Sequence, residues 1–121
     1  MSEHTEQVRL ITCARQWEAK YPELALLHAI PNGGKRHRGT AAKLKAEGVK
    51  AGVPDLCLPV ARGGYHGMYL EMKYGKNKPT PSQAEWLEAL RGQEGYHAVV
   101  CHGFFLAKAA ILEYLEGEAI T

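Results

Sequence analysis

The sequence predicts a mixed α/β domain in which helices flank a small β-sheet. Stretches with apolar residues at helical spacing alternate along the chain with shorter stretches in which apolar and polar residues take turns. Glycine and proline residues separate these stretches, and no repeat, linker or low-complexity tract interrupts them. The expected order is helix, strand, short helix, two strands, helix, strand and helix, which is typical of a layered α/β fold.

Length and composition fit one domain that spans residues 1–121. Apolar residues make up 45% of the chain and charged residues 23%, as in ordinary globular proteins. We find no apolar run near the ~20 residues that cross a bilayer. The first residues also lack the basic and apolar regions of a signal peptide. We therefore expect no membrane association and a cytoplasmic location, in the bacterial host cytosol if a phage encodes the protein.

The first half of the chain predicts two helices and a short strand. A helix is expected over residues 3–20, with Ser2 as its N-cap and an apolar face made of Val8, Ile11, Ala14 and Trp17. The apolar run at 24–30 predicts a strand, and the Pro-Asn-Gly-Gly that follows predicts a turn. A short helix is expected over 40–47, with Gly48 as its cap.

The middle of the chain predicts two strands joined by a hairpin. The first strand covers 55–60, and Arg62-Gly63-Gly64-Tyr65 forms the connection. The second strand covers 68–74. Met68, Leu70 and Met72 should point to one face of it, whereas Tyr69, Glu71 and Lys73 should point to the other.

The last third of the chain predicts helix, strand and helix. Thr80, Pro81 and Gln83 supply an N-cap, a helix-starting proline and the third position of a capping box, so a helix should run from 81 to 93. Residues 96–101 predict a buried strand, and 104–116 predict an amphipathic helix that ends at Gly117.

Cysteine and histidine residues give no sign of a disulfide framework or a zinc site. The three cysteines are widely spaced, and no CxxC pair occurs. We expect all three to be small core residues. None of the six histidines shows the spacing of zinc ligands, so we expect core or edge positions for them.

Basic residues are clustered although the net charge is only +2. Lys35, Arg36, His37 and Arg38 form one run, and Lys73, Lys76 and Lys78 form a second group after Glu71. Clustered cations of this kind can neutralise phosphates. A solvated loop explains the first run equally well.

Two carboxylates fall where neighbouring strands should meet. Asp55 opens one expected strand and Glu71 lies on the next, so a short antiparallel connection brings them together. Such a pair repels unless a cation lies between the two groups, and Mg²⁺ prefers carboxylate and carbonyl oxygens. The Met72 carbonyl can add a ligand, and Lys73 can act on the attacking water or on a charged phosphate. Alternatively, an acidic and a basic residue on an exposed strand face need no function.

Taken together, these motifs closely resemble the PD-(D/E)XK nuclease superfamily, and in particular its virus-type replication-repair nuclease (VRR-NUC) domain. The resemblance covers nearly the whole chain; the matching segments are residues 30–34, 48–56, 67–73 and 81–83, followed by Trp86 and Leu87. It implies a restriction-endonuclease-like core, with a mixed β-sheet flanked by helices. Each motif alone has little specificity, whereas their order and spacing together are specific.

The resemblance also implies roles for individual residues. Asp55 and Glu71 would bind the metal together with the Met72 carbonyl, and Lys73 would be the catalytic lysine. The family places a glutamate on its first helix. Glu3, with Gln7 one turn later, fits that position best, and Glu6 is the second choice. Gln83 matches a glutamine of the family, although the capping box explains this residue equally well.

The function expected from this resemblance is a Mg²⁺-dependent DNA endonuclease in which Mn²⁺ can substitute. The expected substrate is branched DNA such as four-way (Holliday) junctions, in phage or prophage replication, recombination and repair. The alternatives are a non-catalytic DNA-binding module on the same fold and a flap or duplex nuclease. The residues expected to contact DNA are Asn32, Lys35, Arg36, Arg38, Lys76 and Lys78.

We also expect a homodimer, because two coordinated nicks in a junction suit two identical sites related by a two-fold axis. The expected interface residues are the apolar side chains of the last two helices, namely Trp86, Leu87, Leu90, Phe104, Phe105, Ile111, Leu112 and Leu115. The alternative is that both helices simply pack on the sheet.

Overall fold

A mixed four-stranded sheet organises the chain in the computed structural model, which describes residues 2–32, 38–92 and 95–117. The strands, in their order across the sheet, are β1 (His28–Ala29), β2 (Leu56–Leu58), β3 (Gly67–Lys73) and β4 (Tyr96–His102). Strand β3 is antiparallel to β2 and parallel to β4. The α/β class and the expected order of elements are therefore confirmed.

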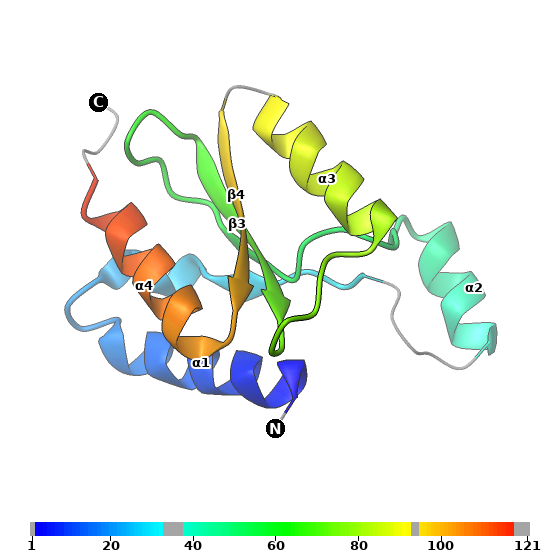
Figure 1. Cartoon of the computed structure of the whole chain (residues 1–121), viewed down its shortest axis with the longest axis horizontal. Helices are drawn as coiled ribbons and strands as arrows, with labels where there is room; N and C mark the ends of the chain where they lie inside the picture. The colour runs from blue at the N-terminus through cyan, green and yellow to red at the C-terminus, as the bar shows by residue number, and fades with distance from the viewer. Residues whose placement is uncertain (1, 33–37, 93–94, 118–121) are drawn as a thin grey trace.

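Helices lie on both faces of this sheet (Figure 1). They are α1 (Glu3–Trp17), the 3-10 helix η1 (Pro22–Leu26), α2 (Arg38–Ala46), α3 (Pro81–Gly92) and α4 (Phe104–Leu115). Helices α1 and α4 lie side by side on one face and α3 lies on the other, whereas α2 projects from the body (Figure 1). Within the described residues, no helix has the length and apolar character needed to cross a membrane.

The main core lies between the sheet and the α1–α4 layer. The β3 side chains Met68, Leu70 and Met72 point into it and are almost fully buried. Leu10 of α1 and Ile111 of α4 close the core from the other side. The predicted alternation along β3 is confirmed, although its other face is also buried rather than exposed.

Helix α1 begins as predicted but ends earlier. The Ser2 hydroxyl accepts a hydrogen bond from the Thr5 amide, which closes a capping box. The amides of residues 20 and 21 both bond to the Trp17 carbonyl, so a turn replaces the last predicted helical residues. The predicted apolar face was wrong at Val8, which is 50% exposed; Leu10 is buried in its place because the helix presents its Leu10–Ala14 side to α4.

The strand predicted at 24–30 was wrong for most of its length. Pro22 starts η1, and the Leu-Ala-Leu run after it continues that turn because leucine and alanine favour helical backbone. Only His28 and Ala29 pair with β2. The short helix predicted at 40–47 is confirmed as α2, which starts two residues earlier and ends one residue earlier.

Strand β2 is shorter than predicted, with three residues instead of six. Asp55 precedes the strand and receives a backbone amide on its side chain, and Pro59 offers no N–H beyond it. The hairpin is confirmed by the bridge between Arg62 and Tyr65. Its Gly63 and Gly64 both have positive φ, which the two-residue turn requires.

The predicted dimer surface needs correction. Leu87, Phe104, Ile111 and Leu115 are all buried within one chain, because α3 and α4 cover the sheet with these side chains. Trp86, Leu90 and Leu112 keep part of their surface open, and Phe105 is exposed. Among the cysteines, Cys57 and Cys101 are buried as expected, whereas Cys13 is only partly buried.

We predict that Tyr114→Phe lowers the free energy of unfolding by about 1–3 kcal/mol. The buried Tyr114 hydroxyl donates a hydrogen bond of 2.6 Å to the Val60 carbonyl, which the variant leaves without that donor. Urea denaturation measures the loss. Tyr65→Phe is the matched control, because Tyr65 is partly exposed. Equal stability of the two variants would contradict the prediction.

Candidate functional site

Asp55 and Glu71 meet at one end of the β2–β3 pair. Leu56 pairs with Leu70 in the antiparallel register, so the residues just outside this pair, Asp55 and Glu71, face each other. The antiparallel neighbourhood expected from the sequence is therefore correct. A register fixed by the buried β2 and β3 side chains thus places two carboxylates together.

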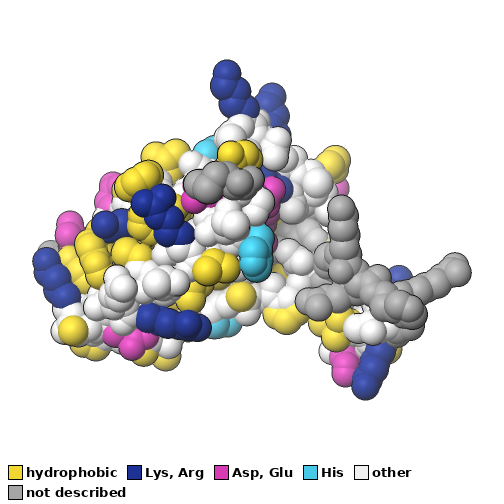
Figure 2. Space-filling view, turned by 90° about the horizontal axis from the view of Figure 1, so that it is seen from below, with side chains coloured by type: hydrophobic (Ala, Val, Ile, Leu, Met, Phe, Trp, Pro, Cys, Tyr) yellow, Lys and Arg dark blue, Asp and Glu magenta, His cyan; other side chains and the backbone are white. Residues whose placement is uncertain are grey.

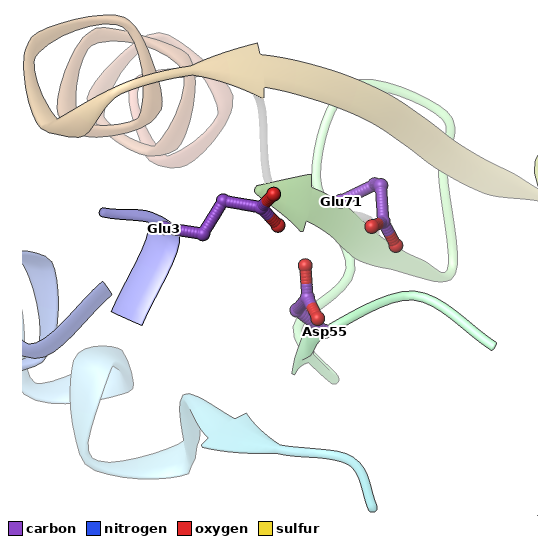
Figure 3. Close-up of side chains that lie close together, drawn as sticks. All are labelled: Glu3, Asp55 and Glu71. Atoms are coloured by element: carbon purple, nitrogen blue, oxygen red, sulfur yellow. The ribbon is translucent and has the colours of Figure 1, made fainter. Parts of the chain in front are cut away.

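A third carboxylate comes from the first turn of α1. Oxygen atoms of Glu3, Asp55 and Glu71 lie within 4.8 Å of one another (Figure 3). Glu6 is one turn further along the helix and lies elsewhere, with Oε1 3.3 Å from where a Cβ on Gly103 would be. The structure therefore brings Glu3, and not Glu6, to the carboxylate pair.

The Asp55 carboxylate is held by two donors. Its Oδ2 accepts a hydrogen bond of 2.7 Å from the Met72 amide, and its Oδ1 accepts one of 3.3 Å from the Asn32 side chain. Asn32, which we expected to contact DNA, thus contacts Asp55 in this structure. The Met72 amide thus links β3 to Asp55, directly after Glu71 in the chain.

The loop before Asp55 is fixed against α3. Gly52 has a φ of +87°, and a Cβ at this position would lie 2.9 Å from backbone and side-chain atoms of Ser82. Only glycine fits both the backbone conformation and this close approach. Pro54 is buried directly before Asp55. These two residues therefore fix the backbone conformation of the loop that leads to Asp55.

Glu71 and Lys73 are buried side by side on β3. Their side chains are 1% and 7% exposed, and Lys73 Nζ lies 3.5 Å from Glu71 Oε2. Burial and, to a smaller extent, the Asp55 charge raise the pKa of Glu71 to about 8, and Lys73 partly opposes both effects. The alternative explanation of the Glu-x-Lys pattern, an exposed strand face without a function, does not fit because both side chains are buried.

The donor set fits a divalent cation. Among the described residues, Glu71 Oε1 is buried without a hydrogen-bond partner, and the three carboxylates offer further oxygen ligands. A buried acceptor of this kind is costly unless a cation or a proton reaches it. Mg²⁺ and Mn²⁺ both favour such oxygen ligands.

A cleft of about 980 Å³ opens beside the carboxylates. The outer face of α1 forms one wall, and Asn32 and Asp55 lie on the other side. Its lining residues on α1 include Glu3, Gln7 and Arg15. A strand of a polymeric substrate therefore has access to Asp55 from the surface.

The remaining predicted site residues have different positions. The side-chain oxygen of Gln83 accepts a hydrogen bond of 2.8 Å from the Thr80 amide, so this glutamine forms the predicted capping box. Lys76 and Lys78 are exposed in the loop after β3. Lys35 and Arg36 lie outside the described residues, and Arg38 begins α2.

Sequence reasoning did not include His102 in the site. In the parallel register His102 lies beside Lys73, so the two side chains share a face of the sheet. Its Nδ1 lies 3.0 Å from the Gly75 carbonyl, to which it donates. The histidine thus anchors the loop that carries Lys76 and Lys78. The pairing depends on a crossover through α3, and no local motif reveals it.

Comparisons with known proteins agree on one family. The model of the VRR-NUC domain family matches residues 4–105. A solved structure described as a VRR-NUC domain protein superposes with a TM-score of 0.83 and 34% sequence identity, over 100% of this chain and 93% of that chain. A search of curated proteins finds no match.

We predict that the free energy of unfolding of the metal-free protein contains a Glu71 contribution that falls as pH rises from 4.5 to about 8. The folded chain keeps a proton in this range that the unfolded chain loses, so the contribution is complete below pH 4.5 and lost above 8. Its slope is at most about 1.4 kcal/mol per pH unit.

Urea denaturation in EDTA across this pH range tests the prediction. Glu71→Gln should remove this part of the slope, whereas Glu85→Gln, on the exposed side of α3, should retain it. If Glu71→Gln and the wild type show the same pH dependence, Glu71 does not hold the extra proton.

Proposed function

The chain belongs to the VRR-NUC domain family, and from this premise we propose that it is a metal-dependent DNA endonuclease. Membership in a nuclease family supplies the reaction class, the hydrolysis of phosphodiester bonds. The observation that carries the proposal is the convergence of Glu3, Asp55 and Glu71 within 4.8 Å. We propose Mg²⁺ as the metal, with Mn²⁺ as a substitute, because all of these ligands are oxygen atoms.

Asp55, Glu71 and the Met72 carbonyl are the proposed metal ligands, with Glu3 as a third carboxylate. A bound Mg²⁺ would supply positive charge to a phosphate and lower the pKa of a coordinated water. The protein's own contribution is a fixed donor set. The Met72 amide orients Asp55, and the buried β3 strand orients Glu71. Preorganised charge of this kind is the main source of catalysis in hydrolytic sites.

Lys73 is the proposed catalytic lysine. Its ammonium group lies 3.5 Å from Glu71 in a nearly closed environment, where a charge acts more strongly than in water. From this position the ammonium group can orient the attacking water or stabilise the charge that develops on the phosphate, and the neutral amine can take a proton from that water. The Gly103 amide holds the Lys73 carbonyl at 3.0 Å, which fixes the end of the strand.

The proposed DNA contacts surround this centre. Lys76 and Lys78 are exposed near the end of β3 and can neutralise phosphates. Lys35, Arg36 and Arg38 stay proposed contacts. Asn32 donates to Asp55 and lines the same cleft, and it stays a proposed DNA contact.

We further propose that branched DNA is the substrate, in phage or prophage replication, recombination and repair. Two nicks in a four-way junction suit two identical sites in a homodimer. The expected interface residues that keep open surface are Trp86, Leu90, Phe105 and Leu112. A flap or duplex nuclease is the alternative that the substrate experiment below distinguishes.

We predict that Asp55→Asn and Glu71→Gln abolish Mg²⁺-dependent cleavage, and that Lys73→Ala lowers the rate by roughly 10²–10³-fold. Glu3→Gln and Glu6→Gln form a matched pair on one helix. Glu3→Gln should impair cleavage more, because only Glu3 reaches the carboxylate pair. The measurement is the single-turnover cleavage rate, with calorimetric Mg²⁺ titration in parallel. Full activity in EDTA, or in Asp55→Asn, would disprove the metal-dependent reaction.

We predict that four-way junctions are cut faster than flaps, unbranched duplex or single strands of the same sequences, and that the protein is a dimer. Cleavage rates on the four substrates and light scattering at micromolar concentration measure both properties. A mass of 13.3 kDa would contradict the dimer. Preference for flaps or duplex would remove the resolvase proposal and leave the nuclease proposal intact.

A further inference from the structure

The first turn of α4 exposes large apolar side chains next to the proposed site. Phe105 and Leu106 are 69% and 58% exposed, which makes them the most exposed large hydrophobic side chains among the described residues. Phe104, directly before them, is buried. The core therefore does not account for Phe105 and Leu106, since a small domain gains no stability from displaying them to water.

Two cations lie over aromatic rings along the line where α1 and α4 meet. The Arg9 guanidinium is 4.3 Å from the ring centre of Phe104 and 4.8 Å from that of Phe105. Lys108 Nζ lies 4.5 Å from the Trp17 ring centre. We call Arg9, Trp17, Phe104, Phe105 and Lys108 the α1–α4 seam. Figure 2, which views the molecule from the α1 side, shows basic and hydrophobic side chains gathered next to one another on this face.

The charges of the seam select its partner. Its two charged members, Arg9 and Lys108, are both positive. A second copy of the chain docked seam to seam would bring these like charges together, whereas a polyanion would meet both of them favourably. The exposed Phe105 ring, with the Arg9 guanidinium beside it, also suits nucleobases, because bases stack on aromatic faces while basic groups hold the phosphates.

The seam begins where the catalytic strand ends. Gly103, the residue before α4, donates its amide to the Lys73 carbonyl. Phe105 follows two residues later. Glu6 also lies against Gly103, so α1, α4 and the end of β3 meet at this point. The first turn of α4 therefore lies next to the end of the strand that carries Glu71 and Lys73.

We infer that the α1–α4 seam binds unpaired nucleotides of the DNA substrate, with Phe105 stacking on a base and Arg9 and Lys108 contacting phosphates. The inference rests on the proposed function, since it takes DNA as the substrate. A paired base in a continuous duplex has no free face to offer Phe105. The seam thus favours DNA with an unpaired segment next to the cleavage site over unbranched duplex.

Binding to a 2-aminopurine-labelled single strand and to the matching duplex tests the inference in EDTA at low salt, without cleavage. Phe105→Ala should weaken single-strand binding roughly five-fold or more and change duplex binding less than about two-fold. Phe105→Trp should restore binding and fluorescence quenching, whereas Phe105→Leu, which is apolar but cannot stack, should not. Leu26→Ala is the matched control, because Leu26 is 52% exposed in η1, outside the seam.

A second pair of variants tests the contribution of the positive charges in the seam. Arg9→Gln should weaken single-strand binding and reduce its salt dependence by about one charge. Lys20→Gln removes a cation that also lies over a ring, 5.5 Å from Tyr21, and should leave binding unchanged. Thermal melts confirm that each variant is folded.

Equal single-strand affinity of the wild type and Phe105→Ala would overturn the inference, and so would the absence of single-strand binding by the wild type. A lower mass of Phe105→Ala in light scattering, with unchanged single-strand affinity, would assign the patch to a second copy instead. The proposed nuclease activity is tested separately, by Mg²⁺-dependent cleavage. Its failure would appear as uncut DNA with the binding differences still present.

Discussion

The repulsion between Asp55 and Glu71 is the constraint on which the rest of the site depends. Two acidic side chains face each other across antiparallel strands, and the one on β3 is almost fully buried. Such an arrangement raises the free energy of the folded chain unless a proton or a cation reduces the charge. The fold withstands this cost because the opposite face of β3 is anchored in the main core. The close carboxylate pair on one face of β3 thus depends on the apolar packing of the opposite face.

The sheet topology brings further residues to the same end of β3. An antiparallel neighbour supplies Asp55, and a parallel neighbour places His102 beside Lys73 and leads directly into α4. The same strand ends therefore lie next to both the carboxylates and the α1–α4 seam. The carboxylate cluster and the α1–α4 seam thus meet through the end of β3, although their residues are spread from the beginning of the chain to its last helix.

Sequence patterns predicted the parts of this architecture that local rules determine. The alternation along β3, the caps at Ser2 and Thr80, and the meeting of Asp55 with Glu71 all follow from spacing and turn chemistry. The choice of Glu3 over Glu6 came from a family resemblance and agrees with the geometry. The roles of these residues remain proposals.

Other features depend on contacts between distant segments, and local sequence patterns do not predict these contacts. Phe104 and Phe105 are adjacent and chemically identical, yet one is buried and the other exposed, because the packing of α4 on α1 decides which ring faces inward. The burial of Glu71 and Lys73 likewise follows from what covers the sheet. The strand prediction at 24–30 was wrong for a different reason, since leucine and alanine suit a helical turn as well as a buried strand.

The chain contacts the body of the protein both before and after the projecting helix α2. Asn32 is bonded to Asp55 before it, and Gly52 is seated against Ser82 after it. Both contacts lie outside α2, so neither depends on an α2 side chain. Helix α2 is thus a natural graft point: a protein engineer could exchange it for another helix and leave both of these contacts in place.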